Sequence, residues 1–278
     1  KAMKIFIVGL GLMGASYALK LDQQVHTIYG YDENKSAIRK GQEEGFLEAD
    51  SDLKKLMISD VVIFALYPNN TYEFIESHQH LFKSGALITD INGVKKGLVN
   101  DIEKTLRPDV RYISHHPMAG RAKRGFDAKD ITMFQNNHFI IVETKRAQDS
   151  DYELMHILAK LLGFKTVIKV SPEYHDQVIA YTSQLTHVIA ASLMLGKEDT
   201  PRQLTGDSFR DLTRIANINE DLWTELFLNN EEELLKAIQA FKNKLSIIET
   251  SIKQKDEKTL KETLKKAKKK REEFENNF

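Results

Sequence analysis

The stretch that decides the fold is KIFIVGLGLMGAS, residues 4–16. It opens with a continuous apolar run, Ile5 to Val8, which is typical of a parallel strand buried on both faces. Gly9, Gly11 and Gly14 follow in the order G-x-G-x-x-G. This spacing predicts a tight turn, a close backbone approach to a pyrophosphate, and a helix packed near the strand. The phosphates of a dinucleotide would then lie at the N-terminus of that helix, where free N–H groups favour negative charge.

An acidic residue after the next predicted strand strengthens this interpretation. The strand ends at Asp32, about 20 residues beyond the glycines, the spacing of a carboxylate that binds a ribose. Such a carboxylate accepts hydrogen bonds from ribose hydroxyls and repels a 2′-phosphate, so NAD is expected, although the nearby Lys35 and Arg39 keep NADP open. The residues expected to bind the cofactor are Gly9, Gly11, Leu12, Met13, Gly14 and Asp32.

Length and composition describe an ordinary globular chain of 278 residues with 41% hydrophobic content. Forty basic residues balance forty acidic ones, so no overall charge favours nucleic acid or a membrane surface. The chain has no cysteine and its nine histidines are scattered, so we expect no disulfide, thiolate nucleophile or metal site. The apolar run near the start is too short for a membrane span, and a cytoplasmic location is expected.

Strands and helices alternate regularly as far as residue 170. This pattern predicts an α/β protein with a doubly wound parallel sheet, whose ligand binds at the carboxyl ends of the strands. After the first strand and a helix over residues 12–20, the expected strands are 27–31, 61–66, 86–89, 112–113, 139–142 and 166–170, and the expected helices are 35–44, 71–81, 95–106 and 149–162.

The pattern changes at Ser171, which can cap a helix whose first turn holds Pro172. A long helix is expected over residues 174–195, and no convincing strand follows it. We therefore expect an NAD-binding Rossmann domain over residues 1–170 and a helical substrate-binding and dimerisation domain over residues 171–278. A helical domain of this size rarely buries all its apolar faces alone, which favours a homodimer. The charge-rich C-terminal stretch is interpreted as a solvated helix face, because no aromatic ladder accompanies it.

Two histidines follow a predicted strand in the segment ISHHPMAG, residues 113–120. This place is the ligand-facing rim of a parallel sheet. Histidine can accept a proton near neutral pH, so His116 is a candidate general base for an alcohol that is being oxidised. The alternative is a structural histidine in a turn.

Polar side chains also occur at helical spacing in the second domain. Ser183 and His187 are four residues apart and share a helix face, where they either pair inside the core or face a polar ligand between the domains. Arg210 and Arg214 show the same spacing, and an arginine fork suits a carboxylate. The alternative for Arg214 is a surface ion pair with Asp211.

The chain carries several further motifs, which in order with those above are GLGLMGAS, Asp32, TDINGVK, HHPMAG, SPEYHD, SQLTH, SFRDLTRIA and Trp223. Together, these motifs resemble the prephenate dehydrogenase family of tyrosine biosynthesis, in the right order over nearly the whole chain. The resemblance implies that prephenate is oxidised by NAD, loses carbon dioxide and becomes 4-hydroxyphenylpyruvate. It also implies that His116 is the catalytic histidine and that His187 and Arg214 bind the substrate, and we add Ser183 to this group.

The chain departs from this family at two places. Gly93 stands where many members carry a serine beside the substrate hydroxyl, so that contact is in doubt although Gly93 is still expected to line the substrate site. Arg121 and Ala122 stand where Thr and Glu are common, so an ion-pair role of that acid cannot be transferred.

Three alternative functions stay open from the sequence. Arogenate differs from prephenate by an amino group in place of a keto group, and an arogenate dehydrogenase has no distinguishing motif here. A 3-hydroxyacid-type dehydrogenase would use a lysine in the long helix, but none occurs between Ser171 and Gly196. A non-catalytic NAD-sensing regulator would need neither His116 nor Arg214.

Overall fold

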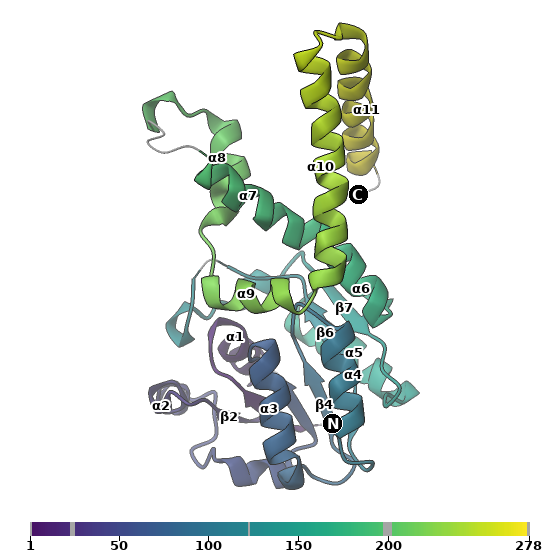
Figure 1. Cartoon of the computed structure of the whole chain (residues 1–278). Coiled ribbons are helices and arrows are strands. Elements are labelled where there is room, and N and C mark those ends of the chain that lie inside the picture. Colours follow the sequence, from purple (N-terminus) through teal and green to yellow (C-terminus); the bar gives the residue numbers. More distant parts are fainter. Residues whose placement is uncertain (1, 23–25, 122, 197–201, 277–278) are drawn as a thin grey trace. The chain divides into compact units, whose positions relative to one another are not determined.

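The computed structural model describes residues 2–22, 26–121, 123–196 and 202–276 (Figure 1). Contacts within the chain divide it into two units, Lys1–Asn230 and Glu231–Phe278, which are described separately.

A five-stranded parallel sheet forms the centre of the first unit, with the strand order β2-β1-β3-β4-β5. Its innermost strands are buried on both faces, which is why they appear in the sequence as continuous apolar runs. The predicted α/β fold class with a doubly wound parallel sheet is thereby confirmed. The strands are β1 (Lys4–Val8), β2 (Thr27–Tyr31), β3 (Val61–Phe64), β4 (Leu87–Asp90) and β5 (Arg111–Tyr112).

Helices cover this sheet on both faces, and alternate residues of β1 enter two different apolar clusters. Ile5 and Ile7 pack with residues of the first and fifth helices, whereas Phe6 and Val8 pack with residues of the third and fourth. This alternation follows from the two-residue period of a strand. The helices are α1 (Leu12–Asp22), α2 (Lys35–Glu43), α3 (Pro68–His78), α4 (Lys96–Thr105) and α5 (Asp149–Leu162), with short 3₁₀ turns at Leu53–Ile58, Gln79–Leu81, Phe126–Ala128 and Ile131–Phe134.

A second sheet differs from the single parallel sheet that the alternating pattern suggests. It contains β6 (Ser114–Pro117), β7 (His138–Val142) and β8 (Thr166–Val170), and β6 pairs with β7 in the antiparallel sense. Only 3₁₀ turns occur in the described part of the connection between β6 and β7. Antiparallel strands need no crossover helix, whereas β7 and β8 are parallel and are joined through α5.

The helices that follow start where the sequence predicts, at a cap in which the Ser171 side chain accepts the backbone N–H of Tyr174. The predicted long helix is continuous but contains one π-helical segment. It consists of α6 (Pro172–Ile179), a π-helix (Ala180–Gln184) and α7 (Leu185–Leu195). Three further elements complete the unit: α8 (Asp207–Thr213), a 3₁₀ turn (Arg214–Ala216) and α9 (Glu220–Leu228).

By length and composition alone, the run Pro172–Leu195 could cross a bilayer, a test that core helices of soluble proteins also pass. Its residues His175, Asp176 and Gln184 are buried and hydrogen-bonded to protein groups.

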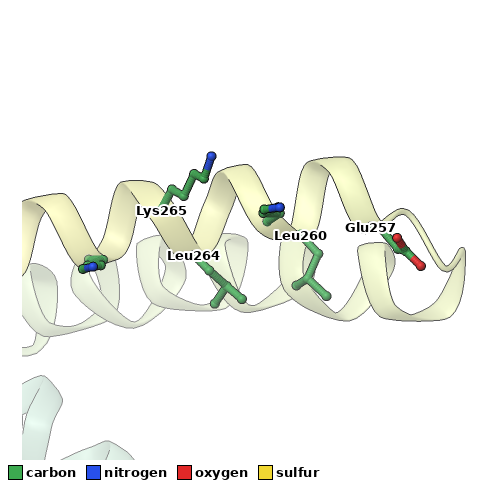
Figure 2. A pocket seen from close by; sticks show the side chains of 6 residues that line it. Glu257, Leu260, Leu264 and Lys265 are labelled. Carbon is green, nitrogen blue, oxygen red and sulfur yellow. The ribbon is translucent and has the colours of Figure 1, made fainter.

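The second unit is a pair of helices, α10 (Glu231–Lys253) and α11 (Glu257–Asn276). Asp256 caps α11 by accepting the backbone N–H of Thr259. Figure 2 shows Leu260 and Leu264 one turn apart on α11, where they line a shallow groove with the stems of lysine side chains. α11 has no buried residue among those described, in agreement with the solvated helix predicted for this stretch.

Candidate active site

The glycine turn after β1 has the geometry that a pyrophosphate needs. Gly9 has φ +92°, and a Cβ atom on Gly14 would lie 1.8 Å from the carbonyl oxygen of Gly9. These two glycines are therefore required by the backbone conformation and by the close packing of α1 on the strand. A Cβ on Gly11 would meet nothing within 4 Å, so the backbone at Gly11 is open to a ligand. The turn fits the predicted cofactor site.

Asp32 lies directly after β2 and joins it to the glycine turn. One carboxylate oxygen accepts the backbone N–H of Leu10 at 2.7 Å, and the other accepts that of Asn34 at 2.8 Å. Lys35 and Arg39 line a neighbouring cavity, and the Lys35 ammonium lies 4.6 Å from the centre of the Tyr31 ring. Lys35 and Arg39, which could favour binding of NADP, thus lie beside the expected ribose site.

The two adjacent histidines of β6 have different environments. His115 is fully buried, with Nδ1 at 2.6 Å from the Thr89 hydroxyl, Nε2 at 3.1 Å from the Tyr17 hydroxyl, and its ring stacked on Phe139. Burial and the nearby Lys95 lower the pKa of His115 to about 3. Both of its nitrogens are occupied, so His115 is a neutral structural residue.

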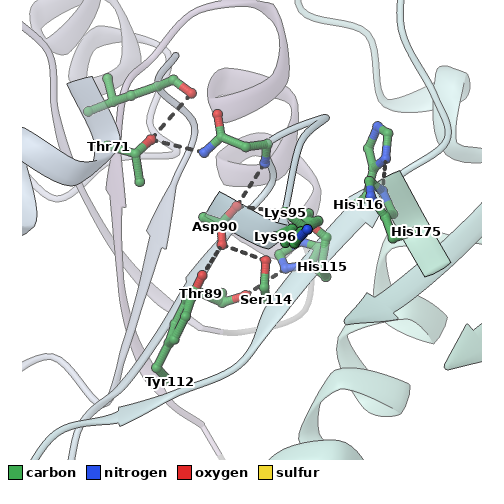
Figure 3. Close-up of polar contacts among 12 residues, drawn as sticks. Thr71, Thr89, Asp90, Lys95, Lys96, Tyr112, Ser114, His115, His116 and His175 are labelled. Carbon is green, nitrogen blue, oxygen red and sulfur yellow. Dashed lines mark hydrogen bonds and ion pairs between the residues drawn. The ribbon is translucent and has the colours of Figure 1, made fainter. Parts of the chain in front are cut away.

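His116 points away from that core, and its two nitrogens have different neighbours. Nδ1 lies 2.8 Å from Nε2 of His175. A dashed line in Figure 3 marks this contact. On the other side, a Cβ placed on Gly93 would lie 3.8 Å from Nε2 of His116 and 3.3 Å from Leu226. Burial lowers the pKa of His116 well below its usual value of 6.5, and His175, Lys95 and His115 lower it further. His116 is therefore neutral at pH 7, as a general base must be.

His175 and Asp176 belong to this group, although the sequence analysis assigned them no role. Nδ1 of His175 lies 2.7 Å from Asp176, and the two carboxylate oxygens of Asp176 accept the backbone N–H groups of Lys95 and Lys96, each at 2.8 Å. His175 and Asp176 are adjacent in a helix and therefore point to different sides. A search for residues that share one helix face does not group these two residues. The available signal was the stretch SPEYHD, residues 171–176, among the motifs of the resemblance.

A buried ion pair supports the strand that carries both histidines (Figure 3). The Lys95 ammonium donates to Asp90 at 2.8 Å and to the backbone carbonyl of His115 at 2.7 Å. The hydroxyls of Tyr112 and Ser114 donate to the other oxygen of Asp90. Burial alone would raise the pKa of Asp90, but Lys95 and these donors hold it below its usual value. The network fixes the backbone of β6 next to His116.

His187 forms a second group with Trp223 of α9. Its ring stacks on the indole at a centroid distance of 3.6 Å, and Nδ1 lies 2.8 Å from the carbonyl oxygen of Ser183. A carbonyl oxygen only accepts, so Nδ1 carries a proton and Nε2 is the remaining group for a ligand. Burial lowers the pKa of His187.

Helix α9 contacts both the group around His116 and the group around His187. Trp223 stacks on His187, and Leu226, three residues later, lies against Gly93. The side chain of Gln184 donates to the carbonyl oxygen of Leu226 at 2.9 Å. Asn230 donates to Gln184 at 2.8 Å and to the carbonyl oxygen of Asp176 at 3.0 Å. Through α9 the structure links the surroundings of His116 and His187.

Arg214 lies at the C-terminal cap of α8, is exposed, and pairs with no other residue that the structure describes. The alternative of a pair with Asp211 is absent among those residues, and Arg210 pairs with Asp207 instead. The 3₁₀ turn that begins at Arg214 packs against α7, the helix that carries His187. No hydrogen bond or ion pair joins the Arg214 side chain to His116 or His187 among the described residues. Arg121 pairs with Asp130 at 2.6 Å, and Ala122 lies outside the described residues.

Two family descriptions account for most of the chain. Residues 15–170 match "Prephenate dehydrogenase, nucleotide-binding domain", and residues 171–266 match "Prephenate dehydrogenase, dimerization domain". The chain belongs to the prephenate dehydrogenase family. Membership confirms the predicted family and enzyme class. It disfavours two alternatives, a 3-hydroxyacid-type dehydrogenase and a non-catalytic NAD-sensing regulator.

Individual members of the prephenate dehydrogenase family are similar over nearly the whole chain. The prephenate dehydrogenase of Lactococcus lactis subsp. cremoris is 31% identical over 98% of this chain and 77% of its own length. The crystal structure of A. aeolicus prephenate dehydrogenase with hydroxyphenyl propionate and NAD+ has a TM-score of 0.88 at 30% identity, covering 99% of each chain. Synechocystis arogenate dehydrogenase has a TM-score of 0.85 at 26% identity, covering 98% of this chain and 100% of its own. The expected cofactor, NAD, is confirmed.

Proposed function

We propose that this chain is an NAD-dependent prephenate dehydrogenase that converts prephenate into 4-hydroxyphenylpyruvate and carbon dioxide. The observation that carries the proposal is His116, a neutral histidine whose Nδ1 is occupied and whose Cε1–Nε2 edge faces Gly93 in a nucleotide-binding fold. The family membership and the similarity to prephenate dehydrogenases support the same activity.

The chemistry follows from one proton acceptor and one hydride acceptor. NAD, when bound, would supply the hydride acceptor. The residues that would hold it are Gly9, Gly11, Leu12, Met13, Gly14 and Asp32. His116 Nε2 takes the proton of the ring hydroxyl while the hydrogen on the same carbon leaves as hydride. The ring carboxylate then leaves as carbon dioxide, and its bonding electrons complete the aromatic ring. His116 returns its proton to the ring oxygen, so the reaction releases no net proton.

Substrate binding is assigned to His187, Arg214, Ser183 and Gly93. Arg214 is exposed and has no partner among the described residues, so its guanidinium is available for a carboxylate. His187 offers Nε2 beside the Trp223 ring, and this atom can donate to a carboxylate only when the imidazole is protonated. Gly93 places a residue without a side chain next to the His116 ring.

The domain boundary at residues 170 and 171 is part of the proposal. The two family matches meet there, whereas contacts keep residues as far as 230 with the first unit. A cytoplasmic homodimer formed by the second domain is also proposed. Its support is the dimerization-domain match and a set of exposed apolar side chains on α6 to α8. Light scattering that shows only monomer at micromolar concentration would contradict the dimer. The exposed residues are Tyr174, Tyr181, Leu193, Met194, Leu195 and Leu212.

The test is an absorbance assay for reduced cofactor with purified protein, supplied with prephenate or arogenate and with NAD or NADP. We expect the highest kcat/KM with prephenate and NAD. Higher kcat/KM with arogenate would favour the second candidate, which the likeness to Synechocystis arogenate dehydrogenase supports. Higher kcat/KM with NADP would assign Lys35 and Arg39 to a 2′-phosphate. Turnover with neither substrate would contradict the proposed activity.

A further inference from the structure

We infer that His175 and Asp176 are positioning residues that hold His116 as the Nδ1–H tautomer, which leaves Nε2 as its proton acceptor. The inference deepens the proposed function and depends on it for the role of His116 as a base. We call the hydrogen-bonded chain of Asp176, His175 and His116 the relay. It begins at the N-terminus of α4, where Asp176 accepts a backbone N–H, and passes through α6 to β6.

Asp176, the first residue of the relay, determines which nitrogen of each histidine carries a proton. Both oxygens of Asp176 already accept backbone N–H groups, from Lys95 and Lys96, so the side chain acts as an acceptor only. Nδ1 of His175 must therefore donate to Asp176. A neutral His175 then has an unprotonated Nε2, which can only accept, and Nδ1 of His116 is its donor.

The opposite order would make His116 useless as a base. If His175 were protonated, its Nε2 would donate to Nδ1 of His116, and Nε2 of His116 would carry the remaining proton. His175 is 2% exposed. The charged groups around the relay are Lys95, Asp90 and Asp176, and His115 is the other titratable neighbour. Burial and Lys95 lower the pKa of His175 although Asp176 opposes them, so the neutral form is the working one.

Asp176 also has a purely structural task, which the test must separate from positioning. Lys95, the N-cap residue of α4, makes no side-chain cap of its own, and Asp176 supplies that cap from α6. Substituting Asp176 would disturb helix and relay together. His175 touches the relay without capping the helix, so His175 is the position to vary.

The experiment compares His175→Gln with His175→Leu, since both side chains fill space but only glutamine has an oxygen near the position of Nε2. The readouts are the ¹⁵N shifts of His116 without substrate, kcat and KM, the pH profile of kcat, and the melting temperature. His138→Gln is the matched control, because His138 bonds to Thr166 and lies outside the relay.

We expect His175→Gln to keep His116 protonated on Nδ1 and to retain kcat within about tenfold. His175→Leu should lose kcat by about 10² to 10⁴, as when a catalytic histidine loses its orienting partner, with little change in KM. Its His116 should show mixed tautomers. The control should match wild type in kcat and in the His116 signal.

The inference is overturned if His175→Leu keeps wild-type kcat and a single Nδ1–H tautomer of His116. It is also overturned if glutamine and leucine lower kcat equally while their melting temperatures fall together. The ¹⁵N shifts are read in the absence of substrate, so a wild-type protein that turns over neither substrate would contradict the proposed function while the tautomer is still measured.

Discussion

His116 has a pKa well below 6.5 because it is buried beside His175, Lys95 and His115. A base must be neutral to work, so kcat/KM should stay level as the pH falls from 7 past 6.5, and should decline only at lower pH, where His116 takes up a proton. His116→Asn should lower kcat by about 10² to 10⁴ with a modest change in KM, and should abolish the acidic decline. Steady-state kinetics across pH would measure both effects. A variant that keeps wild-type kcat and the acidic decline would remove His116 from the mechanism.

Gly93 offers a second test at the residue scale. A Cβ here would lie 3.3 Å from Leu226, close enough to require a small shift, and 3.8 Å from Nε2 of His116. Gly93→Ser adds a hydroxyl beside the proposed substrate site, and one more hydrogen bond should raise kcat/KM by about 2- to 10-fold. Gly93→Ala is the control, because it adds the Cβ alone. Equal kinetics for the serine and alanine variants would place the hydroxyl outside the site.

The residues of the site differ in how far the sequence could predict them. The glycine turn and Asp32 lie close together in the sequence, and a local pattern indicates their geometry. The sequence could not show which of His115 and His116 is structural and which is catalytic. That depends on their partners Tyr17, Thr89 and His175, which come from distant segments. The relay through His175 and Asp176 could not be predicted for the same reason, because its contacts join distant segments.

At the scale of elements, α9 and the π-helix form one assembly. Gln184, the last residue of the π-helix, is buried and joins α9 to Asn230. Gln184→Ala would leave the amide of Asn230 without this acceptor and the carbonyl oxygen of Leu226 without this donor. We expect the free energy of unfolding to fall by about 1–3 kcal/mol and KM to rise, because α9 contacts Gly93 and His187. Urea unfolding and kinetics would measure this.

Thr182→Ala is the control for that variant. Thr182 lies in the same π-helix and is exposed, and among the described residues its side chain bonds only to the local carbonyl of Val178. Equal losses of stability in the two variants would show that the π-helix itself, rather than the link to α9, is the sensitive feature.

The sequence predicted these elements unequally. Most strands and helices before residue 170 lie within a few residues of their expected ranges, because buried apolar runs and caps are local signals. The antiparallel pairing of β6 with β7 and the π-helix were not predictable in that way. The antiparallel pairing depends on a connection without a crossover helix. The π-helix depends on one additional residue per turn, and its last residue, Gln184, bonds to α9.

At the scale of the whole molecule, buried histidines make stability depend on pH. The pKa of His115 is about 3 in the folded protein, against 6.5 for an unperturbed histidine. Below pH 6.5 the unfolded chain binds a proton that the folded chain does not, so the free energy of unfolding falls by about 1.4 kcal/mol per pH unit for this residue alone. The loss continues towards pH 3. Denaturant unfolding at pH 7.5 and 5.5 would measure it, and His115→Gln should show a shallower slope, whereas an unchanged slope would contradict this origin.

The arrangement of the chain also explains why the composition change at Ser171 does not coincide with a break in contacts. His175 and Asp176 bond to β6 and to the start of α4, and Gln184 bonds to α9, so the helices between residues 171 and 230 are tied to the sheet domain. Sequence composition reports the class of secondary structure, whereas the number of contacts across a boundary depends on individual side chains.

Asp176 has a consequence for the order in which the enzyme becomes functional during synthesis. The glycine turn packs on Ala65 and Asp32 bonds to the turn, so these parts lie within the first 65 residues, whereas the proton order of His116 also needs α6 docked on α4. A nascent chain that ends before residue 176 therefore cannot set that proton order. Turnover, unlike nucleotide affinity, reports that the segment around residue 176 has reached its native place.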